Sequence, residues 1–214
     1  MRFMSKAIKY SLGALVTVFV LYLSLDIQSL EKHRASLAPA LFNASDFAAR
    51  FWEESLESAI AEAPPVTDVL KALNEHPQKA FESHGKKLGI SKTYYFLVKG
   101  EGIVEKVTDE YILLALNEHD KIKIAADFIY GNAVRDGSGK VNIDEFLNMT
   151  DFNAVSVAIN KLVKERVVAR LKQSAKEGKQ LEFAGAFEIS EEQVDLSAIL
   201  VLPVSAKISD GKAE

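Results

Sequence analysis

The chain has 214 residues, of which 48% are hydrophobic and 26% are charged, a balance typical of one globular domain with room for an appendage. Its formal net charge of −4 provides no broad basic surface, so we exclude a nucleic-acid partner. The sequence contains no cysteine, which excludes disulfides, thiolate metal sites, cysteine nucleophiles and a lipid-modified cysteine within these residues.

Residues 1–30 are predicted to form a membrane anchor. Arg2, Lys6 and Lys9 precede an uncharged apolar run, residues 10–25, and this order is typical of a secretory signal or a signal anchor. The run is slightly shorter than the ~20 residues of a spanning helix. No A-x-A cleavage site follows it directly, so we favour an uncleaved anchor over a cleaved signal. The cations predict a cytoplasmic N-terminus, a single pass through the inner membrane and a periplasmic soluble domain.

A spacer is expected over residues 31–43 and a layer of helices over residues 44–90. The first helix has apolar residues at helical spacing and is stopped by Pro64 and Pro65. Thr67 is expected to cap a second short helix, and Gly85 to end a third.

From Tyr94 onward the pattern changes to the alternation of apolar and polar residues that is typical of strands. Short turns separate the first three strands, which predicts an antiparallel meander. The expected strands are 93–107, 110–117, 120–127, 180–189 and 198–208. Each of the last two is expected to bury one face and leave the other wet. Their inward residues would be Leu181, Phe183, Gly185, Phe187 and Ile189, and Leu200, Leu202, Val204, Ala206 and Ile208.

One long helix is expected over residues 150–178, capped by Thr150 and stopped by Gly178. Its apolar stripe would consist of Phe152, Val155, Ile159 and Leu162. Three strands, a helix and two strands follow the order of an OB-fold, a five-stranded Greek-key barrel, whose helix we expect to plug one end. The sequence therefore predicts an α+β protein. It has an OB-fold-like five-stranded antiparallel β-barrel (residues 91–209) with a long inter-strand helix and an N-terminal helical layer, preceded by the membrane-anchor helix.

The stretch VRDGSGKVNIDEF, residues 134–146, resembles part of a calcium-binding EF-hand loop. Asp136, Gly139 and Glu145 match positions 3, 6 and 12 of that loop. Val134 would occupy position 1 and offers no ligand, and a strand precedes the stretch instead of a helix. We therefore expect no calcium site and interpret the stretch as a polar turn. The histidines show no ligand spacing: His33, His76, His84 and His119. No metal or cofactor is expected.

Four residues are candidates for binding a ligand or a partner. Arg135 and Asp136 either form a salt bridge that braces the turn, the interpretation we favour, or Arg135 donates a pair of hydrogen bonds (a ligand fork) to a carboxylate or to sugar hydroxyls of a ligand. Asn132 lies in the same segment. Trp52, beside Phe51, is expected in the core more than as a sugar-stacking platform. No nucleophile signature or phosphate-binding glycine loop is present, so catalytic residues and enzymatic activity are not expected.

Several stretches together resemble one bacterial family, over roughly residues 42–209. They are residues 131–136 (GNAVRD), Glu145 with Phe146, residues 158–160, Phe51 with Trp52, the strand FLVKGEGIV, and the closing FAGAFEI and LPVSAKI. The family is that of bacterial predicted periplasmic lipoproteins of unknown function. Its name rests on a lipidated cysteine, which this chain lacks, so the apolar N-terminus must serve as an anchor or be cleaved.

The resemblance implies a role in the cell envelope. Genes of this family commonly lie beside sugar-uptake ABC transporters, which makes transporter components the implied partners. We therefore expect a membrane-tethered periplasmic accessory protein that binds a partner protein or a small solute in support of ABC-type sugar uptake. The alternative is a periplasmic protein that binds a small solute on its own. An exposed apolar patch would favour the first hypothesis, and a deep pocket lined by Arg135 the second.

Overall fold

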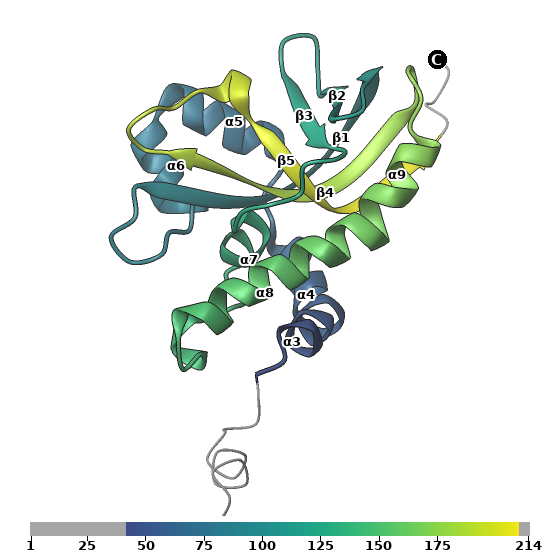
Figure 1. The fold of residues 1–214 in the computed structure, drawn as a ribbon. Helices are drawn as coiled ribbons and strands as arrows, with labels where there is room; N and C mark the ends of the chain where they lie inside the picture. Colours follow the sequence, from purple (N-terminus) through teal and green to yellow (C-terminus); the bar gives the residue numbers. More distant parts are fainter. Residues whose placement is uncertain (1–41, 210–214) are drawn as a thin grey trace, which may run out of the picture. The chain divides into compact units, whose positions relative to one another are not determined.

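Five β-strands close into a barrel in the computed structural model, which describes residues 42–209 (Figure 1). The strand order around the barrel is β1-β2-β3-β5-β4. This order, with the helix between β3 and β4, confirms the predicted α+β OB-fold-like barrel. The strands are β1 (Thr93–Val107), β2 (Tyr111–Ala115), β3 (Lys121–Ala125), β4 (Gln180–Ser190) and β5 (Leu200–Ser209).

The prediction of a wholly antiparallel barrel is wrong for one pair of strands. β3 and β5 pair in parallel, through Lys123 with Leu200 and Ile124 with Val201. The other four strand pairs are antiparallel. Strand direction therefore alternates along those four pairs, and an odd number of strands cannot alternate around a closed ring. Closure of the barrel requires one parallel pair.

The predicted anchor, residues 1–30, lies outside the described residues, as does most of the predicted spacer. Within residues 42–209, no helix is both long enough and apolar enough to cross a membrane. From Asn43 onward the described chain belongs to one compact unit. In this unit the segments predicted as helical layer and barrel contribute to the same hydrophobic clusters.

The N-terminal layer contains the expected three helical stretches. The first comprises α3 (Ala44–Arg50), a π-helical turn and α4 (Leu56–Glu62), and it ends before Pro64. α5 (Val66–Glu75) and α6 (Pro77–His84) follow, and Gly85 comes directly after α6. The prediction that Thr67 caps the second helix is wrong. Pro65 holds an extended conformation, and the helix begins at the next residue.

The long helix between β3 and β4 comprises α8 (Met149–Leu162), a π-helical stretch (Val163–Val168) and α9 (Ala169–Ser174). Thr150 is not its cap. Asn148 is extended, and its side-chain oxygen accepts a hydrogen bond from the amide of Asp151 at 2.9 Å. The predicted apolar stripe is buried at Phe152, Val155 and Ile159, but it continues at Val163 in place of Leu162, which is half-buried.

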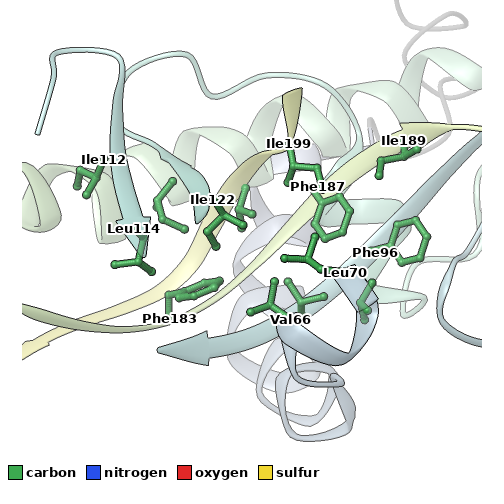
Figure 2. Packing of buried hydrophobic residues seen from close by; sticks show 14 of the residues in the cluster. Val66, Leu70, Phe96, Ile112, Leu114, Ile122, Phe183, Phe187, Ile189 and Ile199 are labelled. Carbon is green, nitrogen blue, oxygen red and sulfur yellow. The ribbon is translucent and has the colours of Figure 1, made fainter. Parts of the chain in front are cut away.

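The barrel interior is filled by strand side chains and by the N-terminal helices. Figure 2 shows Val66 and Leu70 of α5 among side chains from the strands. The rings of Phe96 and Phe187 stack inside the barrel with centroids 5.1 Å apart. The interior receives more helical side chains from α5 and α6 than from the end of the long helix, which contributes Leu171 and Ala175. The expectation that the inter-strand helix plugs the barrel therefore holds only in part.

A second cluster covers part of the outer surface of the barrel. There α3, α4, α7 (Ala133–Ser138) and α8 pack on side chains of β1, β4 and β5. Ala184 and Ala186 of β4 are buried in this cluster, so the prediction of one wet face fails in the middle of that strand.

The inward residues predicted for β5 are also partly wrong. Leu202 and Val204 pack in the outer cluster, whereas Ala206 and Ile208 pack against the interior. The pairs Ala184–Ser205 and Gly185–Pro203 leave Val204 without a partner, which marks a β-bulge. One extra residue reverses the side-chain alternation from that point onward.

Candidate functional site

The stretch that resembles a calcium loop begins with the short helix α7, so its interpretation as a polar turn is wrong. Ala133 and Val134 are 3% and 1% exposed, and α7 packs on β1 and β4. A side chain on Gly137 would come within 3.2 Å of the backbone of Phe96, so glycine permits this close approach. Gly139 then ends the helix with a φ of 64°. Apolar and small residues on one face explain why this segment is buried.

Arg135 is buried and ties α7 to α8. It is 2% exposed. Nε and Nη2 donate to the two carboxylate oxygens of Asp136 at 2.7 and 3.0 Å, and Nη1 donates to the carbonyl of Phe152 at 2.9 Å. The guanidinium also lies over the Phe152 ring, 3.5 Å from its centroid. This geometry is the one expected of a brace, and the choice between brace and ligand fork stays a prediction for mutagenesis.

Two residues of the stretch that resembles a calcium loop, Asp136 and Ser138, make hydrogen bonds with Arg135. Both carboxylate oxygens of Asp136 accept from Arg135, and the hydroxyl of Ser138 donates to the carbonyl of Arg135 at 2.7 Å. Across the part of the chain that the structure describes, no three His, Cys, Asp or Glu side chains are grouped so that they could hold a metal ion. The absence of calcium binding stays a prediction for calorimetry.

Asn132 lies beside this brace, but Trp52 does not. Asn132 lies immediately before α7. Trp52 is half-buried, and its ring lies 5.7 Å from the guanidinium of Arg166. Arg166 is 14 residues beyond Phe152 on the long helix, or about 21 Å at 1.5 Å per residue. The structure therefore does not bring Trp52 and Arg135 into one site.

Two hollows open next to Asn132, on either side of the segment that enters α7. The first, which we call the Glu188 hollow, has a volume of about 250 Å³. It is lined by Phe128, Tyr130, Gly131, Ala133, Phe187, Glu188, Leu200 and Leu202. Phe128 is 54% and Tyr130 is 70% exposed. Our sequence interpretation missed these aromatic residues. Their position between the end of a strand and Gly131 was the available signal.

Glu188 is the charged residue of that hollow. It follows the buried Ala184 and Ala186 on the outer face of β4 and is itself exposed. Burial, and then repulsion by the charge of Asp136, raise the pKa of its carboxyl. The pKa of Tyr95, which is opposite Glu188 on β1, is also raised, chiefly by burial and then by the charges of Glu188 and Asp136. The surroundings of Glu188 therefore favour its protonated form, although the residue is exposed.

The second hollow, which we call the amide trough, has a volume of about 580 Å³ and runs between the segment 129–132 and α8. It shares Tyr130 and Gly131 with the Glu188 hollow. Its polar lining comprises Asn132, Asn153, Ser156, Asn160, Lys161 and Lys164. Asn160 donates to the carbonyl of Gly131 at 2.9 Å. The buried hydroxyl of Ser156 has no hydrogen-bond partner among the described residues.

The strand order and the inter-strand helix define an OB-fold protein. A solved OB-fold protein from Thermotoga maritima is similar in structure, with a TM-score of 0.72 and 25% sequence identity. The match covers 78% of this chain and 99% of that one. No curated protein matches the chain.

The family model described as "Predicted periplasmic lipoprotein (DUF2291)" matches residues 15–207, and the chain belongs to this family. The resemblance inferred from the sequence is thereby confirmed, and the family supports a soluble domain in the periplasm. The family's function is unknown. The 214 residues contain no cysteine for lipid attachment.

Proposed function

We propose that the protein is a membrane-tethered accessory protein that binds a partner protein with the surface around its two hollows, in support of ABC-type sugar uptake. One observation carries the proposal. Phe128, Tyr130 and Val157 are 54%, 70% and 71% exposed and lie around hollows that share Tyr130. Exposed apolar side chains that gather in this way mark interaction surfaces, and tyrosine is enriched in them.

The buried state of Arg135 also supports a protein partner. A solute site built on this residue would need free guanidinium N–H groups in a pocket. Instead, the group is engaged by Asp136 and by the carbonyl of Phe152, and it lines neither hollow. The membrane tether rests on residues 1–30 of the sequence. The link to sugar uptake rests on the gene neighbourhood of the family, which is an association. The proposal includes no catalytic step.

Site-specific cross-linking in living cells tests this function. A photoreactive amino acid is placed at Tyr130 or Val157, and at Ile103 as a control. Ile103 is also an exposed apolar residue, 43% accessible, and pairs with Gln180 on β4. Gln180 is eight residues from Glu188, or about 26 Å along the strand. We expect cross-links to a sugar-transporter component from the first two positions only. Equal labelling from all three positions, with normal sugar uptake in a deletion strain, would refute the proposal.

A second candidate function is binding of a small solute without a partner. The amide trough favours it, because about 580 Å³ lies within the range of small-ligand sites and side-chain amides suit hydroxylated ligands. Calorimetry with neutral sugars and sugar acids tests this. Saturable heat that is lost in Asn153→Ala, together with absent cross-links, would favour this second function over the first.

A further inference from the structure

Glu188 has no partner for its charge in the described part of the chain. No hydrogen bond or ion pair to its carboxylate is found within residues 42–209. The neighbouring acid, Asp136, is paired with Arg135 at 2.7 Å. Arg135 and Asp136 pair with each other, so Glu188 has no counter-ion among these three residues. An exposed carboxylate with no cation of its own is available to a positively charged group from outside the domain.

The walls around this carboxylate are aromatic and aliphatic. Phe128 and Tyr130 come from the segment before α7, and Leu200 and Leu202 from β5. A methyl group added to Gly131 would lie 3.9 Å from Oε2 of Glu188, so the backbone of that segment passes close to the acid. Tyr95 of β1 faces the acid from the paired strand. Aromatic faces and a carboxylate together recognise an organic cation, because both attract its charge while the apolar walls hold its carbon chain.

The size of the hollow limits which organic cations can fit in it. Its volume of about 250 Å³ is below the roughly 300–1,000 Å³ of sites that enclose a small-molecule ligand. One long side chain fits such a space, and the exposed rings of Phe128 and Tyr130 extend the contact onto the open surface. This combination is typical of an anchor residue in a protein interface, which is often arginine.

We propose that the Glu188 hollow receives a lysine or arginine side chain of the partner protein, whose ammonium or guanidinium group pairs with the Glu188 carboxylate. The inference rests on the proposed function and specifies the chemistry of its partner. The aliphatic stem of the incoming side chain packs on Leu200 and Leu202. Its charged end lies between the carboxylate and the aromatic rings.

Charge variants in the full-length chain test this inference. Glu188→Gln keeps the shape and removes the charge, and Glu188→Lys reverses it. Glu182→Gln is the matched control, because Glu182 is an exposed glutamate on the same strand. The readout is the yield of the cross-link from the photoreactive residue at position 157, which does not line the Glu188 hollow. The fluorescence of the single tryptophan, Trp52, verifies that each variant is folded.

We expect Glu188→Gln to lower the yield at least about tenfold, as the loss of one charge-assisted hydrogen bond predicts. Glu182→Gln should leave it unchanged. An acidic substitution of the contacting lysine or arginine in the partner should restore the cross-link to Glu188→Lys. A wild-type yield in Glu188→Gln would overturn the inference and leave the proposed function standing. Absence of a cross-link from the wild-type chain would overturn both.

Discussion

Replacing Arg135 by alanine removes three hydrogen bonds and a stacking contact at once. The carboxylate of Asp136 loses its cation, and the carbonyl of Phe152 loses a donor. Both members of the pair are enclosed, since the side chains of Arg135 and Asp136 are 1% and 8% exposed. The carboxylate therefore cannot recover its solvation without opening the contact between α7 and α8.

The burial of the pair sets the expected magnitude. Breaking a buried ion pair on one side costs about 3–5 kcal/mol, whereas an exposed pair contributes under about 1 kcal/mol. For a protein of this size, about 3–5 kcal/mol corresponds to a fall in melting temperature of roughly 6–20 °C. Asp136→Ala should destabilise to a similar degree, because it leaves the guanidinium buried without its anion. The double variant should lose less than the sum of the two single variants.

The assay is urea unfolding of the three variants, followed by the fluorescence of Trp52, the single tryptophan. Coupled, non-additive losses support a brace. The reasoning is refuted if all three variants unfold like the wild type while cells lose sugar uptake or the partner cross-link. In that case the pair is a binding site, and the hypothesis of a ligand fork replaces the brace.

Three further predictions concern topology, calcium and pH. Alkaline phosphatase fused after Glu214 should be active, because the N-terminal cations retain the N-terminus in the cytoplasm; an inactive fusion at normal expression would contradict the anchor. Millimolar calcium should produce no saturable heat, and a micromolar dissociation constant abolished by Glu145→Gln would show otherwise. Because the pKa of Glu188 is raised in the folded state, its ionised carboxylate destabilises the fold at pH values above that pKa. This loss of stability disappears as pH falls below the ordinary value near 4.5. Glu188→Gln should therefore raise the melting temperature at pH 7.5 and leave it unchanged at pH 4; a lower melting temperature at pH 7.5 would argue against this.

Most of the fold could be predicted because its signals are local. Alternation of apolar and polar residues and short turns locate β1, β2 and β3, and helical periodicity locates the long helix. The errors lie where the pattern depends on distant contacts. The bulge at Val204 shifts the alternation of β5; the neighbouring Pro203 was a local signal of it, but the apolar alternation concealed the shift. The burial of α7 depends on a face formed by β1 and β4.

The candidate site was only partly predictable for the same reason. Arg135 and Asp136 are adjacent in sequence, so their pairing could be expected, but their burial could not. Glu188 stands in an alternating strand and therefore resembles any solvent-facing glutamate. Its setting is created by the segment containing Phe128 and Tyr130, nearly 60 positions earlier in the chain. A single sequence gives no indication that these two segments meet.

The brace and the Glu188 hollow share one segment, and this decides how their variants are compared. α7 begins two residues after Gly131, which lines the hollow, and Arg135 fixes α7 to α8. An unstable Arg135→Ala chain would therefore distort the hollow and lose the partner even if Arg135 never touches it. Glu188→Gln leaves the brace intact. A loss of binding in that variant, at wild-type stability or above, reports on the contact itself.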